Sequence, residues 1–239
     1  MRAAGGVAAR ALRLVGDAVR PGITTERLDR IAEDAIRSAG AAPAFKGYHG
    51  FPATICASLN EAVVHGIPDT VPLKEGDILS VDVGAIVDGY YGDCAATFPV
   101  GKVSAEAATL MDVTRLSLEA GIERCRVGMR LYDISAAVQQ VAEAAGFSVV
   151  REYVGHGIGR SMHEEPQIPN VGQAGTGPTL SEGMVFAIEP MVNAGKAAVR
   201  ALDDGWTVVT EDGALSAHYE HTVAITADGP AILTVEDDG

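Results

Sequence analysis

Residues 78–93 read ILSVDVGAIVDGYYGD, and this stretch predicts a β-hairpin. Between residues 78 and 86, apolar side chains alternate with small or polar ones, which is the period of a strand with one buried face. Asp88 and Gly89 follow, and Asp-Gly between two strand-like runs is typical of a two-residue hairpin turn. One face of this hairpin is therefore apolar, and the other carries polar side chains.

Two carboxylates converge on the polar face. With the turn placed there, Gly84 pairs with Asp93, so Asp93 is a diagonal neighbour of Asp82 on the same face, about 7–8 Å away. Two carboxylates this close repel each other. The repulsion is relieved by protonating one of them, by surrounding them with hydrogen-bond donors or by placing cations between them. Because no Lys or Arg lies between Lys74 and Lys102, the pattern favours a metal. Two solvated acids on an open sheet face are the alternative.

An internal repeat flanks the hairpin. Residues 20–40 and 126–146 each begin with Arg, place Gly two positions later, follow a helical pattern and end on Ala-Gly, with corresponding positions 106 apart. Each copy is preceded by a predicted helix, at 3–19 and at 105–122, and followed by strand-like runs. Chance similarity between two amphipathic helices is the alternative. The repeat favours two similar α+β halves with a site where they meet.

Length and composition agree with one globular domain. The chain has 239 residues, of which 47% are hydrophobic, and no low-complexity linker divides it. This composition excludes a disordered protein, and this length suits one large domain or two small ones. We therefore expect a single domain over 1–239, with halves at about 1–102 and 103–239.

Charge and cysteine usage exclude several classes of partner and site. The 32 acidic and 18 basic side chains give a net charge of -14, which opposes binding to nucleic acid or to an anionic membrane surface. No apolar stretch approaches the roughly 20 residues that span a bilayer. The three cysteines lack C-x-x-C spacing, so neither a disulfide framework nor a thiolate zinc site is predicted. A cytoplasmic location is expected.

The second half of the chain supplies three more candidate ligands. His156 follows a strand-like run at 149–154, Glu189 ends the apolar run 184–188, and Glu220 lies in another strand-like segment. An acid within an apolar strand is costly to bury unless it is paired or coordinated. With the two aspartates, these residues make an oxygen-rich set that suits Mn, Fe or Co better than a thiolate zinc site.

Six segments together resemble methionine aminopeptidase type I. They are GYHGFP (47–52), NEAVVHGIP (60–68), GHGIG (155–159), HEEP (163–166), IEPM (188–191) and YEHT (219–222). The match runs in order over nearly the whole chain. The resemblance implies the bacterial-type form without an N-terminal zinc-binding extension. It also implies an α+β, pseudo-two-fold "pita-bread" fold whose helix-helix-strand halves form one catalytic domain with the metal site between them.

The resemblance assigns five metal ligands to a centre of two divalent ions, Mn, Fe or Co. These ligands are Asp82, Asp93, His156, Glu189 and Glu220, with Asp93 and Glu220 in the bridging places. Hydrolysis at such a centre uses a bridging water or hydroxide.

The resemblance also assigns catalytic and pocket residues. Glu189 carries the proton from water to the leaving amine, His163 stabilises the oxyanion, and His65 bonds the peptide nitrogen. Both histidines face the substrate, and the pocket for the methionine side chain is expected to include Phe45, Tyr48, Phe51, Cys56, Met162 and Trp206. Plain core packing is the alternative for these apolar residues. Three histidines have no individual catalytic role in this interpretation: His49, His218 and His221.

The function implied is removal of the initiator methionine from nascent polypeptides, with preference for a small second residue. The expected partners are N-terminal methionine peptides, nascent chains and, transiently, the ribosome, and the enzyme is expected to be a monomer. A proline-directed peptidase of the same fold is one alternative, but His65 comes too early to leave room for the extra N-terminal domain usual there. The other is a binding relative without metals, against which the presence of all five ligand types argues.

Overall fold

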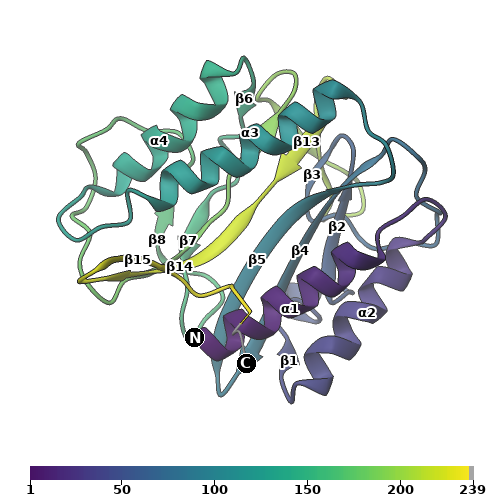
Figure 1. Cartoon of the computed structure of the whole chain (residues 1–239), viewed down its shortest axis with the longest axis horizontal. Coiled ribbons are helices and arrows are strands. Elements are labelled where there is room, and N and C mark those ends of the chain that lie inside the picture. The colour runs from purple at the N-terminus through teal and green to yellow at the C-terminus, as the bar shows by residue number, and fades with distance from the viewer. Residues whose placement is uncertain (237–239) are drawn as a thin grey trace.

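The computed structural model describes residues 1–236 and shows a large curved sheet with helices packed on one face (Figure 1). The α-helices within these residues are α1 (Arg2–Ala18), α2 (Thr25–Ser38), α3 (Ala105–Ile122) and α4 (Leu131–Ala144). None of them is long and apolar enough to cross a bilayer. A short 3-10 helix, η1, spans Tyr48–Gly50.

The strands are short except for one hairpin. They are β1 (Ala42–Pro43), β2 (Ile55–Leu59), β3 (Ala62–Val64), β4 (Ile78–Val87), β5 (Tyr90–Pro99), β6 (Ser148–Val149), β7 (Gly155–Gly157), β8 (Glu164–Ile168), β9 (Val185–Ile188), β10 (Met191–Asn193), β11 (Val199–Ala201), β12 (Val208–Thr210), β13 (Ser216–His218), β14 (Glu220–Thr226) and β15 (Gly229–Ile232).

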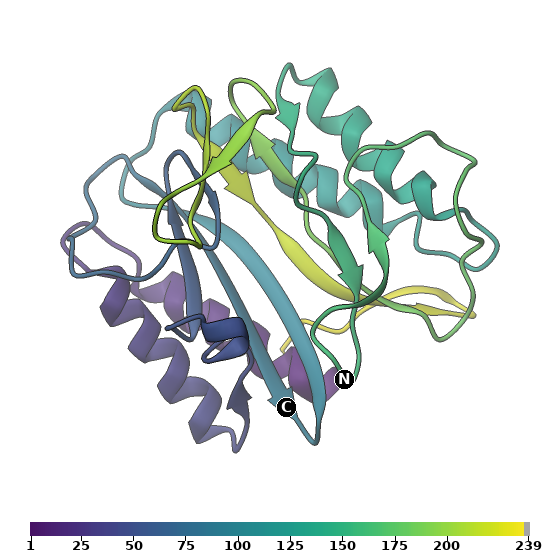
Figure 2. The ribbon, with the colours of Figure 1, turned by 180° about the vertical axis from the view of Figure 1, so that it is seen from behind.

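The main sheet runs in the order β1-β4-β5-β14-β9-β7-β8, with β2 beside β4 and β15 beside β14. Two three-stranded sheets, β13-β10-β6 and β11-β12-β3, lie outside it. In Figure 1 the helices stand in front of the main sheet, and in Figure 2, from behind, the sheet stands in front of the helices. The second face of the sheet is thus left for loops, for η1 and for the site.

The hairpin predicted within residues 78–93 is confirmed. Gly84 pairs with Asp93 in the register that the turn predicts. Asp88 and Gly89 both have positive φ, +50° and +77°, as a type I′ turn requires. The apolar face is buried against α1 and α2 through Leu79, Val81, Val83 and Ala85. The acidic face consequently points away from these helices.

The internal repeat is present in three dimensions. The bounds of α2 and α4 differ by 106 positions at both ends, and those of β1 and β6 do the same. The turns before the two helices match as well: the N–H of Gly22 donates to Leu73 O, and that of Gly128 donates to Leu180 O. Both glycines have φ near +90°, at +88° and +89°. The pseudo-two-fold α+β fold is therefore confirmed.

The strand predicted over 149–154 is wrong. Only Ser148 and Val149 form a strand there, and the chain bends at residues 151–153. Arg151 and Glu152 are exposed in this bend. The chain therefore leaves the three-stranded sheet that contains β6 before it enters the main sheet at β7. His156 itself lies inside β7, between β8 and β9 of the main sheet.

Helix α1 approaches β5 through two glycines, and this contact yields a stability prediction. A Cβ on Gly92 would lie 2.5 Å from the backbone N of Gly5, so Gly92→Ala must push the helix away from the strand. We expect a loss of about 1–3 kcal/mol in the free energy of unfolding, as overpacking usually costs, measured by urea denaturation. Gly6→Ala is the control, because the nearest atom to its added Cβ is 3.5 Å away. Equal midpoints for the two variants would contradict the close approach.

Candidate metal centre

The five predicted ligands come from consecutive strands of the main sheet. Asp82 lies on β4, Asp93 on β5, Glu220 on β14 and His156 on β7, and Glu189 directly follows β9. These strands are neighbours in the order β4-β5-β14-β9-β7. Each strand thus supplies one side chain to a single row that crosses the middle of the sheet.

Strand register explains why the acids share a face. Asp82 and Glu220 both pair with Ala95, from the two sides of β5. Asp93 precedes Ala95 by two residues, and side chains two apart on a strand point to the same face. Asp93 is held further by Thr222, because its N–H donates to Thr222 Oγ1 at 3.0 Å and its carbonyl oxygen accepts from that hydroxyl at 2.8 Å.

The ligand atoms are close together, buried and unsatisfied. One atom each of Asp93, His156 and Glu220 lies within 4.8 Å of the others. Within the described part of the chain, Asp82 Oδ1, Asp93 Oδ1 and Glu220 Oε1 have no hydrogen-bond partner, although Asp93 is only 5% exposed and Glu220 only 2%. Buried carboxylate oxygens without donors are costly. The site is therefore built for cations, and this donor set fits divalent metals.

Burial shifts the pKa of every ligand toward the neutral form. It raises the pKa of Asp93 to about 7. The pKa values of Asp82, Glu189 and Glu220 are raised well above their ordinary range, first by burial and then by the neighbouring carboxylates. This electrostatic conflict is what a bound cation relieves.

The imidazole of His156 has the tautomer that a metal ligand needs. Burial lowers the pKa of His156 to about 4, so the ring is neutral near pH 7. Its Nδ1 lies 2.8 Å from the carbonyl oxygen of Gly157, which can only accept, so Nδ1 carries the proton. The lone pair of Nε2 then faces the carboxylates, as Nε2 lies 3.6 Å from Glu189 Oε1.

A cavity of about 250 Å³ unites the ligands with the predicted substrate pocket. Its apolar wall includes Phe51 and Trp206, whose rings meet edge to face with centroids 5.1 Å apart. Every residue predicted for the site lines this cavity: Phe45, Tyr48, Phe51, Cys56, His65, Asp82, Asp93, His156, Met162, His163, Glu189, Trp206 and Glu220. The structure thus brings the whole predicted set together.

The structure adds residues to which the sequence assigned no role in the site. His49 also lines the cavity, in η1, with a left-handed φ of +47°. Asn170 supports Glu189 by donating from Nδ2 to its carbonyl oxygen at 3.1 Å. The ring of Tyr153 packs against His65, with centroids 5.7 Å apart. His49 lies inside the GYHGFP segment, and this motif could have indicated its place in the cavity. No motif or spacing in the sequence indicates Asn170 or Tyr153.

Comparisons with known proteins agree with this site. Residues 1–227 match the sequence model of metallopeptidase family M24. The chain is 56% identical over 235 residues to a methionine aminopeptidase of Clostridium perfringens, covering 98% of this chain and 94% of that protein. It is 53% identical over 234 residues to methionine aminopeptidase 1 of Bacillus subtilis, covering 98% and 94%.

Solved structures show the same fold. The methionine aminopeptidase of Thermotoga maritima superposes with a TM-score of 0.97 at 48% identity, over 99% of this chain and 95% of that one. The prolidase of Pyrococcus horikoshii superposes with a TM-score of 0.77 at 19% identity, over 99% of this chain but 61% of that one. The second similarity extends to the fold alone.

Proposed function

This chain belongs to metallopeptidase family M24, and on that premise we infer that it is a metal-dependent aminopeptidase that removes N-terminal methionine from peptides. The observation that carries the proposal is the cavity in which the ligand row adjoins an apolar pocket. Full-length relatives named methionine aminopeptidase support it. The proline-directed alternative is not favoured, because similarity to a prolidase is limited to the fold. A relative without metals is not favoured either, since the buried acids fit cations.

The ligand row would hold two divalent cations, with Mn, Fe and Co as candidates. Asp93 and Glu220 are neighbours within the row and both belong to the tight group with His156, and we propose, as the family resemblance implies, that these two would serve both ions. Bound there, divalent cations would lower the pKa of water and polarise the scissile carbonyl. Glu189, directly after β9, is proposed to take the proton of the attacking water and to return it to the leaving amine.

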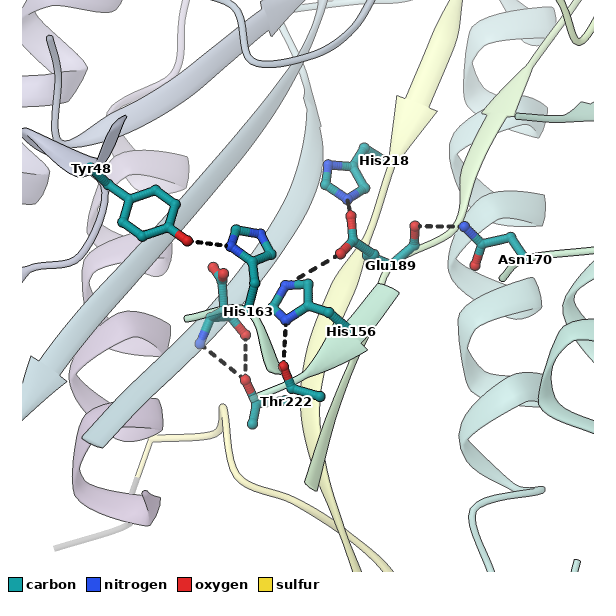
Figure 3. A network of polar contacts seen from close by, with 9 residues as sticks. Tyr48, His156, His163, Asn170, Glu189, His218 and Thr222 are labelled. Atoms are coloured by element: carbon teal, nitrogen blue, oxygen red, sulfur yellow. Dashed lines mark hydrogen bonds and ion pairs between the residues drawn. The ribbon is translucent and has the colours of Figure 1, made fainter. Parts of the chain in front are cut away.

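His163 is proposed to donate a hydrogen bond to the carbonyl oxygen as negative charge develops there. Tyr48 Oη lies 2.8 Å from His163 Nδ1 (Figure 3). Burial raises the pKa of Tyr48 and lowers that of His163, so the phenol donates and the imidazole is neutral. Nδ1 then accepts, and the single ring proton lies on Nε2, where it can be donated to substrate.

His65 is proposed to accept the peptide N–H of the substrate. It lines the same cavity and has a left-handed φ of +61°. This backbone conformation is uncommon for a residue other than glycine and is typical of functional sites. Burial lowers its pKa, which keeps a ring lone pair free near pH 7.

Replacing Tyr48 with Phe tests the tautomer of His163. The ring stays against the pocket wall, but the donor to Nδ1 is lost, so we expect kcat to fall about 10-fold with KM little changed. The measurement is steady-state release of methionine from Met-Ala-Ser. His163→Ala, which removes the donor itself, should cost about 10²-fold or more. A Tyr48→Phe enzyme with wild-type kcat would contradict the assigned roles.

A peptide panel tests the proposed substrate. The apolar wall built by Phe51, Cys56 and Trp206 suits an unbranched apolar side chain, and we propose that a small second residue is preferred. Enzyme loaded with Mn(II), Fe(II) or Co(II) should release Met from Met-Ala-Ser faster than from Met-Leu-Ser, and faster than Leu from Leu-Ala-Ser. Equal release of Leu, or no release by the metal-loaded enzyme, would overturn the proposal.

Further properties belong to the same proposal. We propose that residues 1–239, of which 237–239 lie outside the described part, act as one catalytic domain and as a monomer in the cytoplasm. Nascent chains are the proposed natural substrates, with transient contact to the ribosome.

A further inference from the structure

His218 ends β13, and its backbone is held from both sides by Thr97 of β5. The N–H of His218 donates to Thr97 Oγ1 at 2.9 Å, and that hydroxyl donates back to the carbonyl oxygen of His218 at 2.9 Å. Pairing of β13 with β10 places His218 opposite Met191, two residues after Glu189. The backbone is thus fixed beside the strand end that carries Glu189.

The ring of His218 points at the Glu189 carboxylate (Figure 3). Its Nε2 lies 3.9 Å from Glu189 Oε2. The residue is 2% exposed, and Nε2 has no hydrogen-bond partner among residues 1–236. A buried polar atom without a partner destabilises a fold. The neighbour that can satisfy this atom is the carboxylate it already faces.

Glu189 lies between two imidazoles, one on each oxygen. Oε1 is 3.6 Å from His156 Nε2, and Oε2 faces His218. A carboxylate turns about its last bond, so a single donor on one oxygen determines where the other oxygen points. Donors behind metal ligands commonly fix ligand orientation in this way.

We propose that His218 is a positioning residue for Glu189: its Nε2–H donates to Oε2 and holds Oε1 toward the metal centre. The inference rests on the proposed function only for the naming of Glu189 as a ligand and proton carrier. A shortening of the gap by about 1 Å, to the usual N–H···O length, completes the bond. No proton is transferred between His218 and Glu189 in this arrangement, since His218 only orients the carboxylate.

Three variants test the proposal. His218→Leu removes the donor, His218→Asn keeps a polar group that is too short to reach, and His218→Gln places an amide donor at similar reach. We expect Leu and Asn to weaken Mn(II) binding to metal-free protein by about 10–100-fold, measured by titration calorimetry. They should also lower kcat for Met-Ala-Ser by a similar factor with little change in KM. His218→Gln should stay within about threefold of wild type.

His221→Gln is the matched control. His221 follows Glu220 on β14, so its side chain points to the opposite face of the sheet. Its Nδ1 is already bonded to Thr234 Oγ1 at 2.8 Å, so we expect Mn(II) affinity to be unchanged. In a Glu189→Gln background, His218→Leu should add no further loss of affinity, because coupled residues are not additive. If the Leu variant does not fold, the Asn variant carries the same comparison.

Two results would overturn the proposal. One is wild-type metal affinity and kcat in both the Leu and the Asn variants. The other is equal impairment of the Gln and Leu variants, which would assign His218 to packing alone. Metal affinity is read without substrate, so a failure of the wild-type enzyme to release methionine would reject the proposed function without deciding the role of His218.

Discussion

Replacing Asp93 with Asn should abolish methionine release almost completely while leaving the protein folded. Losing a residue that merely supports a metal ligand commonly costs about 10–100-fold in affinity or activity, and loss of a central ligand should exceed that range. Asp93 is 5% exposed, and its backbone is bonded to Thr222, so an isosteric amide keeps the packing. The measurements are kcat/KM for Met-Ala-Ser and Mn(II) affinity.

The same substitution should act on stability in the opposite direction. The Asp93 carboxylate raises the pKa of Asp82, Glu189 and Glu220, and the amide removes this buried acid. Metal-free Asp93→Asn should therefore unfold at a higher urea concentration than metal-free wild type near pH 8. Asp88→Asn is the control, because Asp88 is exposed in the turn of the same hairpin. Full activity of Asp93→Asn would show that the ligand row is not the metal centre.

Metal-free enzyme should lose stability as the pH rises from 7 to 8.5. Burial raises the pKa of Asp93 to about 7, and it raises the pKa values of Asp82, Glu189 and Glu220 well above their ordinary range. The unfolded chain has released these protons by pH 7, whereas the folded chain still holds some. A buried acid with a raised pKa contributes to the free energy of unfolding while it is protonated. That contribution is lost as the pH rises through the pKa of the group in the folded chain. Each retained proton contributes a slope of about 1.4 kcal/mol per pH unit.

The lower part of this range, from pH 7 to about 8, isolates the carboxylates. Burial also raises the pKa values of the Cys56, Cys94 and Cys125 thiols, but these groups ionise in the unfolded chain mainly above about pH 8. Burial lowers the pKa of His156 to about 4 and that of His218 to about 3, so both rings are neutral in the folded and the unfolded chain above pH 7. These histidines affect stability only below about pH 6.5, where their effect has the opposite sign: the free energy of unfolding decreases as the pH decreases. Surface acids with lowered pKa, such as Asp204 and Asp212, lose their contribution only at still lower pH.

Divalent metal should reverse the loss of stability that the metal-free enzyme shows as the pH rises. Cations stabilise the ionised ligands, so the gain in melting temperature on adding Mn(II) should grow between pH 7 and 8.5, and binding should release protons. Melting curves after chelator treatment, with and without Mn(II), measure the first effect, and calorimetry in buffers of different ionisation enthalpy measures the second. Metal-free Asp93→Asn should show a flatter pH dependence. A metal-free wild type that gains stability over this range would contradict the buried-acid interpretation.

The hairpin and its two acids were predictable because both depend on local rules. A two-residue turn fixes the register, and the period of two then places Asp82 and Asp93 on one face. The repeat was predictable for a similar reason, since glycines that need positive φ mark equivalent turns at Gly22 and Gly128. The strand predicted over 149–154 was wrong because apolar content alone does not reveal where the chain leaves a sheet.

The remaining ligands were placed by motif resemblance and not by spacing. His156, Glu189 and Glu220 are far apart in sequence, and they meet only because β14 and β9 insert between β5 and β7. The pairing of β13 with β10 likewise decides that His218 faces Glu189, although nothing local to residue 218 indicates it.

The sequence by itself therefore determined the two halves, the central hairpin and the kinds of side chain available for the site. Only the tertiary structure decided which side chains meet, which oxygens lack partners and which histidine supports which carboxylate. The physical reason is that turns and alternation act over a few residues. Non-local strand pairing depends on the packing of the whole sheet, and it sets burial, which then sets the charge state of every group in the site.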